Sequence, residues 1–392
     1  MTVEVMMWLS AAGIVYTYLV YPAVVRFLSM RRRRPAAPPL VDPAPKISVV
    51  ISAFNEESVL GEKLNNLSSL SYPSGRIEFL IGSDGSSDGT VSILRASTLP
   101  GLRVLDFPKR RGKCAVLNDL VSEAGGEIVV FSDANTIYDG QALQHMIRHF
   151  VDPEVGGVCG ELMLRSGVEN AAGKGESSYW KYETAIKKWE SDYKTTVGAT
   201  GGVYAIRKTL YKPLPVHKPI VDDFLIPLEV VRRGYRMVYE PRALVFEETS
   251  ASVSMEFRRR VRIGAQNFSG IPDFADLLNP LRGFIAFALW SHKILRWCVP
   301  FLAIVVFAAS AILAPTAPLY ATVFVIGLSL LALAGLGGIA DRLGLHIGFL
   351  GIPFYIVVMN FALFAGFLKY LTGRQQTTWT VDRTTWAKQK NG

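Results

Sequence analysis

The sequence predicts an α/β protein with a mostly parallel sheet, helices on both faces of it, and membrane-spanning segments toward both ends of the chain. Three observations lead to this prediction. Apolar runs typical of buried strands alternate with helical patterns between about residues 46 and 150, which is the element order of parallel sheets. Two of these runs end in Asp84 and Asp133. Long apolar stretches on either side reach the ~20 residues that a membrane span needs.

The first element, residues 1–30, predicts a membrane span, because Met6 to Met30 is apolar except for Arg26. Arg31 to Arg34 follow it, and by the positive-inside rule they keep this side in the cytoplasm and the N-terminus outside. A cleaved signal peptide fits poorly, because the basic cluster follows the apolar stretch. Residues 31–45 are basic and rich in Pro, and predict a stiff linker.

The soluble domain is expected over residues 46–253, with strands and helices alternating in its first part. The predicted strands are Ile47–Ala53, Ile77–Ser83, Leu102–Phe107 and Glu127–Asp133. The predicted helices are Ser58–Leu70, Gly89–Ala96, Lys113–Glu123, Gln141–Phe150, Ser177–Tyr193 and Phe224–Val231.

Residues 254–297 predict amphipathic interfacial helices, because Ser254–Phe268 has an apolar face opposite a face of arginines. Residues 298–371 predict three spans, and residues 372–392 form a basic tail. Four spans put that tail outside, whereas its Lys and Arg residues favour the inside. The sequence therefore leaves the side of the tail open. The three later spans are expected at Cys298–Leu313, Leu319–Leu336 and Gly348–Leu371.

The charge distribution indicates membrane lipids as a partner and no nucleic acid. The formal net charge is +9, and much of it lies beside apolar spans, as in Arg31–Arg34 and Arg258–Arg262. Anionic lipid headgroups are the simplest partner for such clusters, and the sequence carries no nucleic-acid-binding motif. Three widely spaced cysteines give neither a disulfide framework nor metal-ligand spacing, which suits a reducing cytosol.

Acidic residues follow two of the predicted buried strands. Carboxylates at the carboxyl ends of strands in an α/β sheet lie where such folds bind ligands, and Asp84 and Asp133 have this position. Asp133 and Asn135 alternate along the chain, so their oxygens point the same way from an extended backbone and suit Mg²⁺ or Mn²⁺. An ordinary turn capped by the Asp side chain is the alternative at each strand end.

Two further charged clusters suggest acid–base chemistry and anion binding. Asp222 and Asp223 are adjacent, so each raises the pKa of the other, which suits one of them to act as a general base. Both also suit the start of the following helix.

Arg110-Arg111-Gly112-Lys113 opens a helix, where positive charges oppose the helix dipole unless an anion such as a diphosphate is bound. Alternatively, Arg110, Arg111 and Lys113 are simply exposed to solvent, which explains their charges equally well.

Six motifs occur in a fixed order: Phe54-Asn55-Glu56, Ser83-Asp84-Gly85-Ser86, Lys113 with Ala115-Val116-Leu117-Asn118, Asp133-Ala134-Asn135, Thr200-Gly201-Gly202 and Asp222-Asp223. Together with spans on both sides, they resemble the family 2 glycosyltransferases, most closely the cellulose-synthase-like membrane branch that includes chitin and hyaluronan synthases. The resemblance covers about residues 46–270. It implies a GT-A-type, Rossmann-like soluble domain with N- and C-terminal transmembrane helices and interfacial helices.

The resemblance implies roles on the donor side. Asp84 would hold the nucleotide of a nucleotide-diphospho-sugar, most simply a UDP-sugar, and Phe54 and Glu56 would line the pocket for its base. Lys113 would lie near the diphosphate, and Arg262 is a second candidate for that contact.

On the reacting side, the resemblance implies that Asp133, with Asn135 near it, carries the Mg²⁺ or Mn²⁺ ion and so contacts the donor. Asp223 would be the base that deprotonates the acceptor hydroxyl, and Asp222 stands where the family often has Glu. Gly201 and Gly202 would lie on the acceptor side.

One departure from the family pattern bears on the product. The processive synthases carry a Gln-x-x-Arg-Trp signature after the base, and its counterpart here is Arg259-Arg260-Val261-Arg262-Ile263. Arg262 keeps the Arg, whereas Arg259 replaces the Gln and Ile263 replaces the Trp that supports the growing sugar chain. The loss of the Trp argues against processivity. A lipid-facing basic stripe is the other interpretation of these arginines.

The expected activity is inverting transfer of a sugar to a saccharide or lipid-linked acceptor for cell-surface or exopolysaccharide synthesis, by an enzyme of the cell membrane with a cytoplasmic catalytic domain. Two alternatives stay open: a processive synthase that exports its polymer, and an inactive subunit that binds nucleotide-sugars. Four aromatic residues are expected to serve as interface anchors or core rather than as sugar platforms. They are Tyr179, Trp180, Tyr182 and Trp189.

Overall fold

The computed structural model describes residues 2–32, 38–165, 171–248, 253–343, 345 and 348–373, with the backbone alone for residues 171–179. Most of the basic tail, Arg33 and Arg34 lie outside these residues. The predicted alternation in the first part of the soluble domain is confirmed, with boundaries within two residues for most elements. Its elements are β1 (Ile47–Ala53), α3 (Glu57–Ser68), β2 (Ile77–Asp84), α4 (Thr90–Ala96), β3 (Leu102–Phe107), α5 (Lys113–Glu123) and β4 (Ile128–Asp133).

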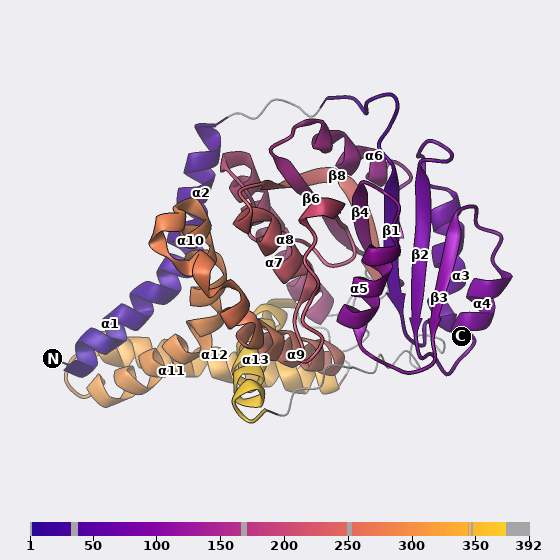
Figure 1. The fold of residues 1–392 in the computed structure, drawn as a ribbon. Coiled ribbons are helices and arrows are strands. Elements are labelled where there is room, and N and C mark those ends of the chain that lie inside the picture. The colour runs from indigo at the N-terminus through magenta and orange to yellow at the C-terminus, as the bar shows by residue number, and fades with distance from the viewer. Residues whose placement is uncertain are drawn as a thin grey trace.

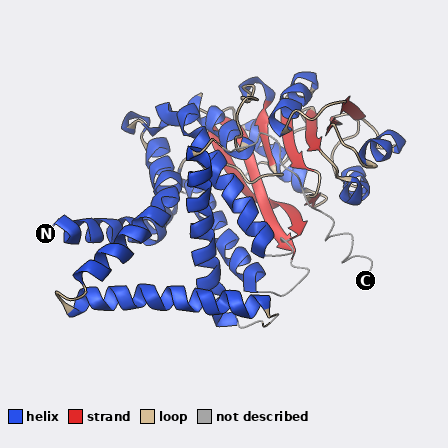
Figure 2. Ribbon diagram, turned by 90° about the horizontal axis from the view of Figure 1, so that it is seen from below, coloured by secondary structure: helices blue, strands red, loops and turns tan. Residues whose placement is uncertain are grey.

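Over the described residues, the sheet has eight strands in the order β3-β2-β1-β4-β7-β6-β8-β5; strands are drawn in red in Figure 2. β1 to β4 are parallel to one another, and β7 runs antiparallel to both β4 and β6. β6 and β8 are also parallel, and β5 is antiparallel to β8. The sheet therefore has the parallel pairs that the sequence predicted, together with antiparallel pairs of β7 and β5 that it did not predict. The four strands that the sequence did not predict are β5 (Ile137–Tyr138), β6 (Val155–Arg165), β7 (Tyr204–Arg207) and β8 (Arg236–Glu248).

Glycines explain why β6 carries a weak strand signal. Gly156, Gly157 and Gly160 lower its strand propensity, but each lies where a side chain would collide. A Cβ on Gly157 would come within 2.2 Å of the sulfur of Met237 in β8, and one on Gly160 within 2.5 Å of the Ala243 carbonyl oxygen. Tight pairing with β8 therefore requires glycine where propensity disfavours it.

The central strands are buried on both faces, which explains their unbroken apolar runs. In β1, Val50 faces a core formed with α5, whereas Val49 and Ile51 face a second core formed with α3 and α6. Later helices complete these layers. They are α6 (Ala142–Ile147), followed by the 3-10 turn Arg148–Val151, then α7 (Ala171–Tyr193), the 3-10 turn Lys208–Leu210, and α8 (Asp222–Arg232).

Within the described part of the chain, four helices are long and apolar enough to cross a membrane: Thr2–Met30, Phe284–Leu313, Pro318–Arg342 and Gly348–Leu371. The first comprises α1 (Thr2–Val15), a π-helical turn (Tyr16–Val20) and α2 (Tyr21–Met30). The second comprises α10 (Phe284–Ala288), a π-helical turn (Leu289–Ile294) and α11 (Leu295–Leu313). The third and fourth are α12 (Pro318–Arg342) and α13 (Gly348–Leu371).

The second candidate span begins at Phe284, ahead of the Cys298 start expected from the sequence. His292, Lys293 and Arg296 interrupt its apolar pattern, and for this reason the pattern predicts an interfacial helix there. In the structure these side chains pair with acidic groups of α7, which allows them to lie inside the long helix. The interfacial part proper is α9 (Val253–Gly270) with the 3-10 turns Ile271–Leu278 and Pro280–Arg282.

Helix α7 lies between the sheet and the candidate spans (Figure 1). It contacts β8 on one side and both α2 and α13 on the other. Helix α9 packs along α13, and their crossing is close, because a Cβ on Gly366 would lie 2.8 Å from the carbonyl oxygen of Val261. One region of the molecule is therefore surrounded by the ends of the parallel strands, by α7 and by the candidate spans.

Candidate active site

The ends of β1 and β2 form one wall of this region. Asp84 is only 3% exposed, and its two carboxylate oxygens accept the backbone N–H groups of Arg111 at 2.6 Å and Gly112 at 2.8 Å. This fixes the loop before α5 against β2. The guanidinium of Arg110 then lies 3.7 Å from the centre of the Phe54 ring. The result is a flat aromatic and cationic surface beside the strand ends.

Glu56 joins the same wall at the start of α3. Its backbone N–H donates to the Thr90 hydroxyl at 2.8 Å, which ties the turn after β1 to the turn after β2. Its side chain is buried and lines the same cavity as Phe54 and Asp84. The structure thus brings together the three residues assigned to the nucleotide by resemblance.

Lys113, the first residue of α5, links two acidic clusters. Its ammonium lies 2.9 Å from Asp133 at the end of β4 and 3.2 Å from Asp222 at the start of α8. Burial disfavours the charged form of Asp133, but the charge and hydrogen bond of Lys113 outweigh this and hold its pKa below the ordinary value. The same carboxylates raise the pKa of Lys113 against the effect of burial. Both groups therefore stay ionised.

Asp223 has the opposite environment. Burial, and then the negative charge of Asp222, raise its pKa to about 6, although Lys113 and Lys187 act to lower it. This carboxylate is therefore the one suited to take and release a proton near neutral pH.

The Gly201-Gly202 turn lies directly against these carboxylates. A Cβ on Gly201 would be 2.9 Å from the Asp223 carboxylate and 3.7 Å from that of Asp133. Gly202 has φ of +78°, and a Cβ there would be 2.8 Å from Thr136 and 3.2 Å from Asp133. Glycine at both positions keeps open the space between the two acids, and only Gly201 of the pair lines the cavity.

The donor atoms at the end of β4 fit a hard divalent cation. Asp133 is ionised, and Mg²⁺ is commonly held by one or two carboxylates together with substrate phosphates. Asn135 donates through its amide nitrogen to Glu247 of β8 at 3.0 Å, a bond that does not use the amide oxygen a cation would bind. Within the described residues, no group of three or more His, Cys, Asp or Glu side chains could hold a metal ion.

Helix α9 closes the cavity from the membrane side with arginines. Arg262 lines it, and burial followed by the nearby charge of Arg259 lowers the pKa of its guanidinium, opposed by Asp222, Asp133 and Asp223. Arg262 thus lies within electrostatic reach of the acidic cluster rather than only facing lipid. Ile263, which stands where processive synthases have Trp, lines the same cavity.

Most of these groups border one cavity of about 1460 Å³. Of the residues to which the motifs assign a role, Gly202 alone lies behind its wall. The others line it: Phe54, Glu56, Asp84, Lys113, Asp133, Asn135, Gly201, Asp222, Asp223 and Arg262.

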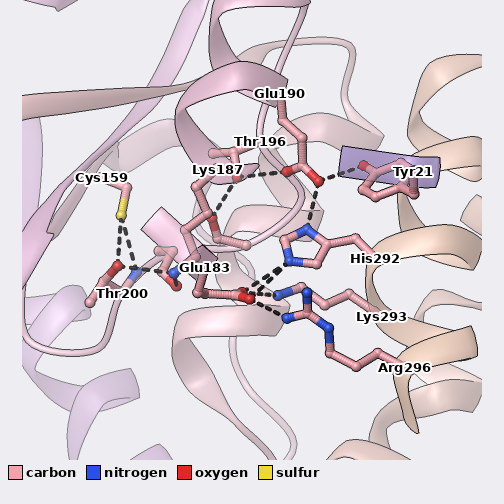
Figure 3. A network of polar contacts seen from close by, with 12 residues as sticks. Tyr21, Cys159, Glu183, Lys187, Glu190, Thr196, Thr200, His292, Lys293 and Arg296 are labelled. Atoms are coloured by element: carbon pink, nitrogen blue, oxygen red, sulfur yellow. Dashed lines mark hydrogen bonds and ion pairs between the residues drawn. The ribbon is translucent and has the colours of Figure 1, made fainter. Parts of the chain in front are cut away.

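A buried ionic network on α7, which the motifs did not predict, supports this site (Figure 3). Lys187 donates to the Ala199 carbonyl at 2.9 Å and to the Thr200 hydroxyl at 3.0 Å, immediately before the glycine turn. Glu183 and Glu190 belong to the same helix and are 5% and 0% exposed. Glu183, Lys187 and Glu190 are spaced so that they share one face of the helix. This spacing of charged residues can be recognised in the sequence.

The network also joins α7 to two candidate spans. His292 lies between the two acids, 2.6 Å from Glu190 and 3.1 Å from Glu183, and Tyr21 of α2 donates to Glu190 at 2.7 Å. Lys293 lies 2.9 Å from Glu183, which also pairs with Arg296. Burial alone would raise the pKa of Glu183, but the neighbouring cationic groups hold it well below its ordinary value.

The aromatic residues of α7 have a packing role. Trp189 and Tyr182 pack with Tyr21 of α2, and the Tyr182 hydroxyl donates to the Tyr18 carbonyl at 2.9 Å. Trp180 packs against the core, and both Trp180 and Tyr182 line the cavity. The side chain of Tyr179 lies outside the described residues.

Comparisons with known proteins find similarity to one family in the soluble domain. The model of glycosyl transferase family 2 matches residues 48–214. Poly-beta-1,6-N-acetyl-D-glucosamine synthase of Staphylococcus aureus strain COL is 27% identical over 231 residues, covering 57% of this chain and 54% of that protein. The probable glycosyltransferase YdaM of Bacillus subtilis strain 168 is 27% identical over 235 residues, covering 56% and 54%. The chain spans about half the length of these curated relatives.

A solved structure supports the fold. The mannosyltransferase PcManGT from Pyrobaculum calidifontis, in complex with GDP-Man and Mn²⁺, superposes with a TM-score of 0.68 over 93% of this chain and 99% of its own, at 21% identity. The GT-A-type fold implied by the sequence motifs is therefore confirmed. Residues 48–214 of this chain are thus similar to the glycosyl transferase family 2 domain, and within the described residues four helices beside it are long and apolar enough to cross a membrane.

Proposed function

We propose that this protein is an inverting membrane glycosyltransferase that moves a sugar from a UDP-linked donor to the hydroxyl group of a saccharide or lipid-linked acceptor. One observation carries the proposal. Asp133, Asp223 and Lys113 come from three separate segments of the chain and meet beside the Gly201-Gly202 turn. A base of raised pKa beside a cation-binding carboxylate is the arrangement that sugar transfer to an alcohol requires.

On the donor side, the base of the nucleotide would lie against Phe54 and Arg110, and the ribose near Asp84. Lys113 and Arg262 would approach the diphosphate from α5 and α9. Asp133 and Asn135 would hold Mg²⁺ or Mn²⁺, and the bound ion supplies positive charge that stabilises the departing diphosphate. Once the negative charge of the departing diphosphate is neutralised in this way, the diphosphate needs no protonation by an acid.

On the acceptor side, Asp223 takes the hydroxyl proton while the acceptor oxygen forms a bond to the anomeric carbon. The bond from that carbon to the diphosphate breaks, and the nucleoside diphosphate leaves with the electron pair. Attack from the face opposite the leaving group inverts the configuration. The small Gly201 leaves room for the acceptor between Asp223 and Asp133.

We propose that the catalytic domain lies on the cytoplasmic face of the cell membrane, because Arg31 and Arg32 directly follow the first candidate span. Nucleotide-sugars are then available to it, and the spans contact membrane lipids. The synthase named among the curated relatives supports a product for cell-surface or exopolysaccharide synthesis. Ile263 in place of Trp favours addition of one sugar over processive export of a polymer.

The test is a screen of nucleotide-sugars with the purified full-length protein, with and without Mg²⁺ or Mn²⁺, followed by mass analysis of the products. We expect metal-dependent release of UDP and a product enlarged by one sugar. Asp223→Asn should lower turnover about 10²- to 10⁴-fold at saturating donor. Asp106→Asn removes a carboxylate from a surface pair with Arg95 and should leave turnover unchanged.

Two results would contradict the proposal. Turnover of Asp223→Asn within a few-fold of wild type would remove the assigned base. Binding of nucleotide-sugars without release of nucleoside diphosphate by the wild-type protein would identify a binding subunit instead of an enzyme.

A further inference from the structure

The cavity does not end at the catalytic residues but continues between the candidate spans. Beyond Asp223, its walls are formed by apolar side chains of α11, α12 and α13, a part that we call the chamber. Six residues define the chamber: Val299, Ala303 and Phe307 of α11, Val323 and Ile326 of α12, and Phe364 of α13.

Two aromatic rings lie where the catalytic part meets the chamber. Phe224 follows Asp223 directly in α8, and its ring centre lies 5.7 Å from that of Trp297 in the second span. Both residues line the cavity. A ligand that extends from Asp223 into the chamber would therefore pass these rings.

Three polar side chains that border the chamber donate to or contact protein groups, although the amide oxygen of Asn360 is buried without a hydrogen-bond partner among the described residues. Ser310 donates to the carbonyl of Phe307, and Asn360 donates to the carbonyl of Ile356, each within its own helix. The Tyr355 hydroxyl lies 3.5 Å from Arg260 of α9. A sugar chain needs many hydrogen-bond partners along its path, whereas a hydrocarbon tail needs only apolar contact.

We propose that the acceptor is a membrane lipid with a hydroxyl-bearing head group, whose head lies at Asp223 and whose hydrocarbon tail occupies the chamber. This inference rests on the proposed function and specifies its acceptor. The head gives its hydroxyl proton to Asp223 and forms the glycosidic bond, while the tail anchors the lipid between α11, α12 and α13. The product would be the same lipid with one more sugar on its head.

The acceptor test uses full-length protein in nanodiscs, a donor found in the screen above, and alkyl β-glucosides with methyl, butyl, hexyl and octyl tails. A buried CH₂ group contributes ~0.8 kcal/mol, or about fourfold. We therefore expect kcat/KM for transfer to rise steeply from the methyl to the octyl compound. The ratio of octyl to methyl kcat/KM is the readout, because effects on the donor cancel in it.

Matched variants assign the tail to the chamber. Val323→Phe and Ala303→Phe each add a ring to the chamber lining, from α12 and α11, and should lower the octyl-to-methyl ratio at least tenfold. Val325→Phe adds the same ring to the same helix as Val323→Phe, at a residue that is 56% exposed and does not line the cavity. It should keep the wild-type ratio. Equal ratios in all three variants would overturn the proposal, as would equal kcat/KM for methyl and octyl acceptors.

A second readout does not depend on catalysis. A photoactivatable diacyl glycolipid in the nanodiscs should cross-link to the chamber walls, as mapped by mass spectrometry of peptides from α11 and α12. Val323→Phe should reduce this labelling several-fold and Val325→Phe should not. Equal labelling of both variants would overturn the tail site. Labelling as expected without any sugar transfer would preserve the lipid site while contradicting the proposed function.

Discussion

At the scale of single residues, the surroundings shift the pKa values of two carboxylates in opposite directions. Lys113 holds the pKa of Asp133 below its ordinary value against the effect of burial. Burial and Asp222 raise the pKa of Asp223 to about 6. Environments that push the pKa values of two acids apart separate a cation ligand from a general base.

We predict an acidic limb in the pH dependence of kcat/KM. Asp223 acts as a base only when it is ionised, so activity should fall about tenfold per pH unit below about pH 6. In Asp222→Asn, loss of the neighbouring negative charge lowers the pKa of Asp223, so the limb should move to lower pH. Initial rates of both proteins, measured from moderately acidic to neutral pH, would locate the limb in each. A limb at the same pH in both proteins would contradict this coupling.

At the scale of elements, the turn before β7 requires glycine for two reasons. Gly202 has a positive φ, and a Cβ there would meet Thr136 and Asp133. A side chain at residue 202 would therefore strain the backbone of the turn and also press against Asp133, the carboxylate that would hold the cation.

We predict that Gly202→Ala lowers transfer activity at least tenfold, because the Asp133 carboxylate must move. Gly234→Ala is the matched control, since φ is +86° there and nothing lies within 4 Å of the added Cβ. It should cost about 1–2 kcal/mol of stability and leave kcat/KM unchanged. Steady-state kinetics, combined with thermal unfolding, separate the loss of activity from the loss of stability. Equal activity losses in Gly202→Ala and Gly234→Ala would show that backbone strain alone lowers activity.

A second element-scale prediction concerns the crossing of α9 and α13. Gly366→Leu should push α9 away, because even a Cβ would lie within 2.9 Å of the backbone of Val261 and Ala265. Displacement of Arg262 should then raise KM for the donor about tenfold or more. Gly335→Leu in α12, where nothing lies within 4 Å, should leave that KM unchanged. An unchanged KM in Gly366→Leu would disconnect α9 from donor binding.

At the scale of the whole molecule, α7 connects the candidate spans to the glycine turn. Glu183 and Glu190 pair with groups of the second candidate span, and Tyr21 of the first donates to Glu190. Lys187 of the same helix holds Ala199 and Thr200. The glycine turn and the candidate spans are thus connected through one buried network.

We predict that Glu183→Gln destabilises the protein by about 3–5 kcal/mol, because it leaves buried cationic groups without their counter-charge. Thermal unfolding in detergent should show a markedly lower midpoint. Asp106→Asn removes a pair whose Arg95 side chain is 70% exposed and should cost at most about 1 kcal/mol. Similar midpoints for these two variants would mean that the network contributes little.

Much of the architecture could be predicted because its signals are local. Strands β1 to β4 are continuous apolar runs, and Asp84 and Asp133 stand at their ends, where the parallel pairing of β1 with β2 and β4 brings them to one edge. Strand β6 could not be predicted in this way, because its glycines serve contacts with β8, which is distant in sequence.

The sequence by itself determined the alternating α/β order, the motif residues and the apolar spans, since each depends on the periodicity or chemistry of neighbouring residues. Only the tertiary structure decided that Asp133 and Asp223 meet at the glycine turn and that His292 and Arg296 belong inside a long helix. The physical reason is that a charge is tolerated in a buried site only beside its partners, and these partners come from distant parts of the chain.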